Sequence, residues 1–199
     1  MTTTTPAPPV AGAVVDIDFQ QGTDAASVGL EALSPGPHGV TTDLAITGGV
    51  ARARRLEVEV YARTTGLGSA DHWVEADLRI GADIAGNYTG VMTRVSASDA
   101  GYAWHKLEVW GSWNGFRLLT LVGSRIADEQ YFPYRLQANT TYRIRLEARG
   151  STISGWVDGR PLFEVTAPSV PWSPTAGINM TASGDPSNST LDNLRAGPL

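Results

Sequence analysis

The sequence has no cysteine among its 199 residues, so disulfide bonds, thiolate catalysis and cysteine-based metal sites are excluded. Basic residues are also scarce: fifteen Lys and Arg stand against twenty Asp and Glu, which gives a net charge of -5. Because nucleic-acid binding depends on a basic surface, we expect no nucleic-acid partner. No apolar run approaches the roughly 18 residues that a membrane-spanning helix needs, so no membrane insertion is expected.

The first residues, MTTTTPAPPV, lack the basic and apolar segments of a secretory signal peptide. Residues 1–12 are rich in Thr and Pro and have little to bury, which predicts a flexible arm outside the fold. The remaining residues, 13–199, have a length typical of one domain. The predicted organisation is therefore an arm followed by a single domain.

Short segments of alternating polarity, separated by Gly, Pro, Asn and Asp, fill most of the chain. In such segments every second side chain faces the same side of a sheet, which is typical of strands with one buried face. Residues 24–33 and 127–136 are expected to hold a helical turn or two. The pattern predicts an all-β, antiparallel β-sandwich, with strands at residues 14–19, 55–62, 72–81, 89–97, 101–110, 116–124, 141–149, 177–183 and 189–197.

Two dipeptides, Asn114-Gly115 and Asp158-Gly159, lie between neighbouring predicted strands. A two-residue type I′ turn needs positive φ at both central residues, and Asn, Asp and Gly tolerate that conformation. The sequence therefore predicts a tight hairpin at each dipeptide.

The order of several segments resembles the concanavalin A-like jelly-roll superfamily, which includes laminin-G-like, pentraxin-like and glucanase-like domains. The resemblance spans about residues 13–197 and is carried by DIDFQQGT, NYTGVMTRVSASDAGYAWHKLEVW, GSTISGWVDGRPL and the terminal LDNLRAG. It implies a jelly roll in which the last strand lies beside the first. The superfamily includes lectins, glycosidases, adhesion modules and virion proteins, so fold alone does not decide function.

Three features further resemble small tail-associated proteins of bacteriophages. They are the Thr/Pro-rich arm, the start without a signal peptide, and the use of fourteen Arg with a single Lys, Lys106. This resemblance implies a virion protein.

Catalytic carboxylates are the first site to consider, because glucanases of this superfamily carry E-x-D-x-E on one strand. The nearest match is Glu75, Asp77 and Arg79, in which the third acid is replaced by an arginine. A neighbouring cation favours the ionised carboxylates and opposes a general acid. A second alternating strand offers Glu57 and Glu59. Both sets are expected to form solvated polar faces.

The histidines, His38, His72 and His105, are scattered along the sequence, and no G-x-S-x-G motif accompanies them. No phosphate loop or dinucleotide fingerprint is present either. We therefore expect a protein without catalytic machinery.

Metal binding is suggested by the resemblance, since related jelly rolls often hold a structural Ca²⁺ near the paired first and last strands. Asp16, Asp18 and Asp192 would lie in that region. The competing interpretation is that these acids deter edge-to-edge pairing of strands. No other cofactor is expected.

The segment YAWHKLEVW has large rings and charged groups at alternate positions. Its opposite positions, Ala103, Leu107 and Val109, suit a core, and His105 is the exception among them. Rings mixed with hydrogen-bonding groups suit stacking on the C–H faces of sugars, yet they also suit a protein interface or simple packing. The candidate ligand-binding residues are Tyr102, Trp104, Lys106, Glu108, Trp110 and Trp113.

Together these features favour a non-catalytic, virion-associated structural or recognition protein of the phage-tail type. Its expected partners are other virion proteins or a host-surface glycan, with homo-oligomers possible. The alternative is a carbohydrate-binding module of a secreted, extracellular glycan-processing system. An active glycosidase of the glucanase type ranks third.

Overall fold

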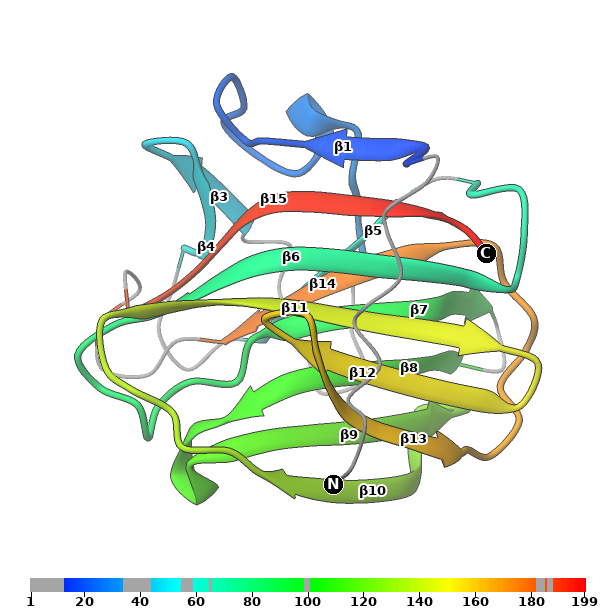
Figure 1. The fold of residues 1–199 in the computed structure, drawn as a ribbon. Helices are drawn as coiled ribbons and strands as arrows, with labels where there is room; N and C mark the ends of the chain where they lie inside the picture. Colours follow the sequence, from blue (N-terminus) through cyan, green and yellow to red (C-terminus); the bar gives the residue numbers. More distant parts are fainter. Residues whose placement is uncertain are drawn as a thin grey trace.

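A computed structural model describes residues 13–33, 44–54, 59–64, 66–98, 101–181, 185 and 188–199. Its strands form two antiparallel sheets that pack face to face, here called the front and rear sheets as they appear in Figure 1. The predicted all-β sandwich is confirmed. The predicted arm, residues 1–12, lies outside the described residues. No helix of the described residues is long and apolar enough to cross a membrane.

The front sheet places strands from both ends of the chain side by side. Val15 of the first strand pairs with Ala196 of the last, as the resemblance implies. Its order is β13 (Arg160–Thr166), β12 (Thr152–Val157), β11 (Thr140–Arg149), β6 (His72–Ile80), β15 (Ser189–Pro198), β4 (Val50–Ala53) and β3 (Leu44–Thr47), with β1 (Val15–Ile17) paired to β15.

The rear sheet carries the segment with the candidate ligand-binding residues, β8, near its centre. Two 3₁₀ turns accompany the strands: η1 (Ala26–Val28) and η2 (Gly111–Trp113). The order is β10 (Arg125–Pro133), β9 (Gly115–Val122), β8 (Gly101–Trp110), β7 (Gly90–Ser98), β14 (Ala176–Thr181), β5 (Glu59–Arg63) and β2 (Glu31–Ala32).

The core lies between the sheets and follows the predicted alternation. Val74, Leu78 and Ile80 of β6 are fully buried, as are Ile144 and Leu146 of the neighbouring β11. Each such side chain stabilises the fold by about 1.5–3 kcal/mol when it leaves water. The outer face of this sheet departs from the prediction of a solvated polar surface, as Arg145 and Glu147 are buried there.

Of the two predicted hairpin turns, one is confirmed and the other is wrong. Asp158 and Gly159 have φ of 51° and 73°, as a type I′ turn between β12 and β13 requires. Asn114-Gly115 does not form a two-residue turn. Instead η2 precedes Asn114, which donates its N–H to Gly111 O at 3.0 Å, and the Gly111 N–H ties this turn to Asn87 O at 3.1 Å. A Cβ on Gly111 would meet Ile84 O, so the turn needs glycine there.

Residues 127–136, expected to contain helical turns, instead belong mostly to β10. Gly123 and Ser124 both have positive φ and turn the chain directly from β9 into β10. A register irregularity between Ile126 and Asp128 breaks the alternation that would reveal this strand in the sequence. In residues 24–33 the expected helical turn is present as η1.

Candidate functional site

The predicted face of β8 is correctly assigned. Leu107 and Val109 point into the core between the sheets. Trp104, whose side chain alternates with those of Leu107 and Val109, belongs to a second apolar cluster with Leu33 and Tyr61 on the outer face of the rear sheet. The register predicted for residues 101–110 therefore holds, and the rings lie on the face opposite the core.

These side chains were predicted to be accessible to a ligand, and for the middle of β8 that prediction is wrong. Trp104, Lys106 and Glu108 are 0%, 1% and 0% exposed. Trp104 packs against the ring of Tyr61 at 4.9 Å, and Leu33 holds the cluster together by donating its N–H to Tyr61 O at 3.0 Å. For Trp104 simple packing is thus the correct alternative, because side chains from β5 and beyond β2 cover it.

Tyr102 and Trp110, at the two ends of β8, are half-buried, and Trp113 in η2 is 70% exposed. The structure therefore divides the candidate residues into a buried central group and partly accessible residues at both ends of β8. The end with Trp110 and Trp113, here called the accessible end, offers the most exposed ring of the candidates.

A row of alternating charges joins the buried centre to the accessible end. Lys106 Nζ lies 3.0 Å from Glu59 Oε1 and 2.9 Å from Glu108 Oε2. Arg117 donates from Nε to Glu108 Oε1 at 2.8 Å and pairs through Nη1 with Glu129 at 2.5 Å. Five side chains of alternating sign therefore cross the outer face of the rear sheet from β5 to β10.

The electrostatics of this row favour its charged forms. Burial alone would lower the pKa of Lys106, but Glu108, Tyr61 and Glu59 raise that pKa above its ordinary value. Burial would likewise lower the pKa of Arg117, and Glu108 instead raises it. Burial would raise the pKa of Glu129, whereas hydrogen bonds from Tyr131 and Arg117 lower it. The row thus keeps its ionised groups fixed in place.

The accessible end contains an aromatic platform made of Trp110, Trp113 and Tyr131. The rings of Trp113 and Tyr131 stack with their centroids 5.3 Å apart and their planes 23° apart. Trp110 meets Tyr131 edge-on at 6.2 Å, and the Arg117 guanidinium lies 3.3 Å from the centre of the Trp110 ring. Tyr131 is 42% exposed, so the platform offers ring surface to solvent beside the ion pair of Arg117 and Glu129.

A hydrogen bond of Asn114 holds in place the turn that carries Trp113. Asn114 takes the left-handed conformation, with φ of 52°, and its Oδ1 accepts the N–H of Leu136 at 3.0 Å. This contact ties η2 to the chain that follows β10. Trp113 is consequently held against Tyr131.

Three residues of this region were missed by sequence reasoning: Arg117, Glu129 and Tyr131. The last two lie in β10, which was expected to be helical. The Gly123-Ser124 dipeptide is the signal that would have revealed the hairpin. With that hairpin in place, alternation along β9 and β10 puts Arg117 and Tyr131 opposite each other.

The predicted metal residues, Asp16, Asp18 and Asp192, do not form a group that could hold a metal ion. Asp16 accepts a hydrogen bond from Arg195 Nε at 3.1 Å, and Asp18 accepts one from the N–H of Gln20. Burial, with Asp77 and Asp18 nearby, raises the pKa of Asp192. Among the described residues no three His, Cys, Asp or Glu side chains are placed to hold a metal ion.

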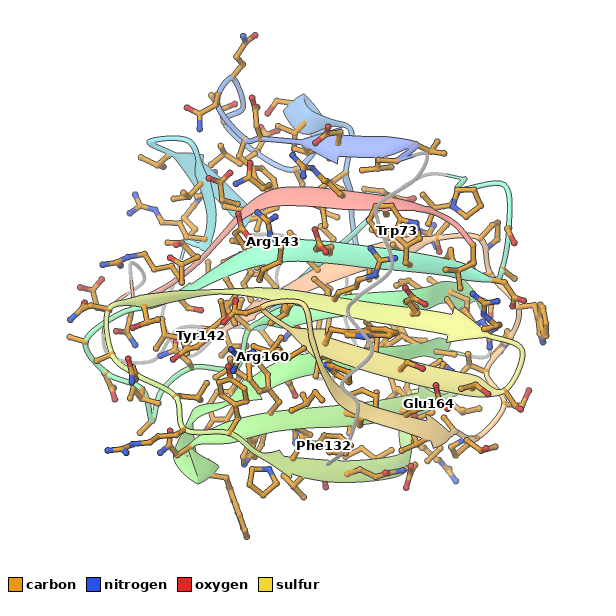
Figure 2. All side chains as sticks on the ribbon, viewed as in Figure 1. Trp73, Phe132, Tyr142, Arg143, Arg160 and Glu164 are labelled. Carbon is orange, nitrogen blue, oxygen red and sulfur yellow. The ribbon has the colours of Figure 1, made fainter. Side chains whose placement is uncertain are left out.

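Two of the other candidate carboxylates, Glu75 and Asp77, lie on the front sheet, apart from the platform. Arg143 donates to both oxygens of Asp77 at 2.8 and 2.9 Å, and Figure 2 shows Arg143 over this sheet. Arg79 is exposed, as expected, but Glu75 is buried. Glu57 lies outside the described residues, whereas Glu59 belongs to the charge row.

Two of the three histidines lie close to one residue, Arg94, while His38 falls outside the described residues. His72 Nε2 accepts the N–H of Arg94 at 3.2 Å. Burial lowers the pKa of His72 and of His105 to about 4, and the Arg94 charge contributes to both shifts. These histidines are therefore neutral at neutral pH.

Comparison with known proteins identifies the fold. No protein-family model and no curated protein sequence matches the chain. Among solved structures it is similar to a β-glucanase of Bacillus licheniformis, with a TM-score of 0.66 and 13% identity over 96% of this chain and 100% of that one. It is also similar to a prokaryotic β-1,3-1,4-glucanase (lichenase) derived from a mouse hindgut metagenome, with a TM-score of 0.65 and 11% identity over 92% of this chain and 98% of that one.

A non-enzymatic structure is also similar: the carbohydrate-binding module CBM66 from Bacillus subtilis, with a TM-score of 0.62 and 14% identity over 85% of this chain and 95% of that one. None of these three is a virion protein, so they give the phage resemblance no support. The expectation of a protein without catalytic machinery is wrong, because two of these three similar structures are glucanases and the fold therefore points toward glycosidases. The chain has the concanavalin A-like jelly-roll fold that these glucanases and this binding module share.

Proposed function

We propose that this protein binds glycan chains through the aromatic platform, as a carbohydrate-binding unit of an extracellular glycan-processing system. The observation that carries the proposal is the exposed, nearly parallel pair of Trp113 and Tyr131 beside the Arg117–Glu129 ion pair. A sugar ring has an apolar C–H face and a rim of hydroxyls. Flat rings next to charged hydrogen-bonding groups match both parts.

Preorganisation supports this function. Glu108 accepts a hydrogen bond from the Arg117 guanidinium, and the Trp110 ring packs against that guanidinium. Asn114 fixes the turn that carries Trp113. A ligand that docks on side chains already fixed loses less conformational entropy than one that must order them. The charge row therefore acts as a support for the platform.

The comparisons support the same class of ligand. The similar structures are named as glucanases and as a carbohydrate-binding module, all of which act on or bind glycans. Polymeric glycans of this kind lie outside cells, which favours an extracellular location over a virion. At 11–14% identity these likenesses show the fold, so the ligand is inferred from the platform.

Glycoside hydrolysis is a second candidate function, suggested by the proximity of two carboxylates, but the Lys106 cation between them favours their ionised forms and opposes a general acid. Glu59 and Glu108 each lie within 3.0 Å of Lys106 Nζ, so these oxygens are at most about 6 Å apart, near the spacing of a retaining pair. Glu108 is fully buried, so hydrolysis requires the side chains that cover it to move apart. Binding at the open platform needs no such movement and remains the primary proposal.

The test is a titration of soluble β-glucans and other polysaccharides by isothermal calorimetry, with reducing-sugar release measured in parallel. Trp113→Ala and Tyr131→Ala should each weaken glycan binding about three- to tenfold, from the loss of ring stacking worth about 0.5–1.5 kcal/mol. Ile126→Ala is the matched control, because Ile126 is a 55% exposed apolar residue on the same strand and lies outside the platform.

Equal binding by wild type and both platform variants would refute the proposal. If no polysaccharide binds and Trp113→Ala instead changes the oligomeric state, the platform is a protein interface. Release of reducing sugar that Glu108→Gln abolishes would establish the second function.

A further inference from the structure

A cavity of about 230 Å³ opens at the end of the sandwich opposite η2, next to the turn between β11 and β12. That turn lies at the right edge of Figure 1, whereas the connection from β8 to β9 lies at the lower left. Arg94, His105, Ser151, Pro168, Ser169 and Trp172 are among the residues that line the cavity. None of them belongs to the platform or to the charge row.

Arg94 takes an unusual backbone conformation at this cavity. It has a φ of 54°, where β7 is bulged relative to β8 between Thr93 and Ser96. A residue with a side chain rarely adopts this region, and such outliers cluster at functional sites. Bulges also redirect side chains next to binding sites. Here the bulge sends the Arg94 N–H to His72 and its guanidinium to the cavity wall.

The guanidinium of Arg94 is fixed by several partners. It donates from Nε to Ala70 O at 3.0 Å, from Nη1 to Gly150 O at 2.6 Å and from Nη2 to Asp71 Oδ1 at 2.9 Å. A guanidinium has five N–H groups, so two of them make none of these three bonds. Its face lies 4.7 Å from the ring centre of Trp172.

Both rims of the cavity are fixed by hydrogen bonds. Ser173 donates its hydroxyl to Val95 O at 2.8 Å, which holds the neighbouring Trp172 over Arg94. On the other side Ala167 donates its N–H to Ser151 O at 3.1 Å. Trp172 is nevertheless 63% exposed, so a large ring is anchored at the mouth with most of its surface uncovered. A preformed mouth of this kind is typical of ligand sites.

The charge of the cavity favours a neutral ligand. Asp71 neutralises Arg94, and Asp71 also accepts the N–H of Gly150 at 3.0 Å. His105 bonds through Nδ1 to the Thr120 hydroxyl at 3.0 Å, and burial keeps its pKa near 4, so its ring is uncharged at neutral pH. The remaining polar groups are the hydroxyls of Ser151 and Ser169.

The volume favours one ring. A cavity of about 150 Å³ accepts benzene, and drug-sized ligands occupy pockets of about 300 Å³ or more. A volume of about 230 Å³ therefore suits a six-membered ring with several small substituents. Its mixed lining of hydroxyls, guanidinium N–H groups and an indole face suits a ring that carries hydroxyls.

We propose that this cavity is a second binding site, which takes a single neutral sugar residue such as the exposed end of a glycan chain. The site is separate from the platform, so it does not depend on the function proposed above. In it Trp172 stacks on the ring of the sugar, while Arg94, His105 and the two serines bond its hydroxyls.

The experiment is a ¹H–¹⁵N NMR titration with the methyl glycosides of glucose, galactose, mannose and fructose, with glucuronate and inorganic phosphate as anionic probes. At least one neutral glycoside should shift the amides of Ser151 and Ser169 saturably, with a dissociation constant in the millimolar range. Trp172→Ala should weaken that binding about three- to tenfold. Ser169→Phe should abolish it by filling the cavity from an exposed position while the melting temperature is unchanged.

The platform variant Trp113→Ala distinguishes the two sites, because the shifts of Ser151 and Ser169 should persist in it. The inference is overturned if none of the neutral glycosides shifts these amides at about 100 mM, some twenty-fold or more above the expected millimolar constant. It is also overturned if Ser169→Phe binds as well as wild type, or if the anions bind and the glycosides do not. Failure here leaves the platform proposal standing, since its test uses different residues and polymeric ligands.

Discussion

Trp104 near the start of β8 and Trp113 just beyond its end differ completely in exposure, at 0% and 70%. Both rings lie outside the main core, and the sequence offered both as ligand-binding candidates. Leu33 and Tyr61 cover the first, while the second stacks on Tyr131. Strand alternation reveals the side of a sheet that a residue faces, whereas accessibility depends on segments distant in the sequence.

The largest effect is expected at the centre of the charge row. Glu108→Ala leaves Lys106 buried with one carboxylate fewer and should lower the free energy of unfolding by about 3–5 kcal/mol. Glu129→Ala, at the accessible end of the row, should cost less than about 1 kcal/mol. Urea unfolding followed by circular dichroism measures both. Equal losses for the two variants would contradict the division into a buried centre and an open end.

A similar loss is expected for the buried ring itself. Trp104→Ala removes a fully buried indole and should cost about 3–5 kcal/mol, through lost apolar burial and the cavity left behind. The melting temperature is the measurement. A loss below 1 kcal/mol would show that Trp104 is not packed as described, and that the middle of β8 is open like its end.

Two buried histidines, His72 of β6 and His105 of β8, give a pH test. His72 and His105 have pKa values near 4 in the fold against 6.5 ordinarily, so the unfolded chain binds more protons between these values. Their stabilising effect is complete above pH 6.5 and is lost as the pH falls toward 4. Each should contribute a loss of about 2 kcal/mol between pH 7 and pH 5.

His105→Gln is the variant that isolates one of these contributions. Between pH 7 and pH 5 the variant should lose about 2 kcal/mol less unfolding free energy than the wild type, which is half of the loss due to the two histidines. An unchanged slope would mean that His105 is solvated, like the residues at the end of β8.

The smallest effect on stability is expected at the platform. Trp113→Ala should change the free energy of unfolding by less than about 0.5 kcal/mol, because its ring is largely exposed. Thermal unfolding checks this result. A loss above 2 kcal/mol would show that Trp113 is a packing residue, and the contrast with Trp104 would disappear.

The sandwich and the register of β8 could be predicted, because they rest on alternation and on local turns such as Asp158-Gly159. The neighbouring first and last strands were expected only from the resemblance to the jelly-roll superfamily. The cover over Trp104 could not be predicted, since Leu33 reaches it from seventy residues away. The partners of Trp113 were missed for a different reason. Asp128, Glu129 and Gln130 form a polar run in β10 just after a register irregularity, so the segment has no clear strand pattern. Arg94 has no sequence signal, because only the folded bulge shows its φ.

The pairing of β1 with β15 determines how the sandwich responds to mechanical load. Val15 pairs with Ala196 and Ile17 with Leu194 in an antiparallel register, so the chain enters β1 and leaves β15 at the same end of the strand pair. We therefore expect tension applied to both ends to load the hydrogen bonds of this pair one after another, so that β1 separates before the longer strands. The platform lies in the rear sheet, which β1 does not join. A tethered molecule can thus lose its first strand under tension while the rings of Trp113 and Tyr131 keep their positions.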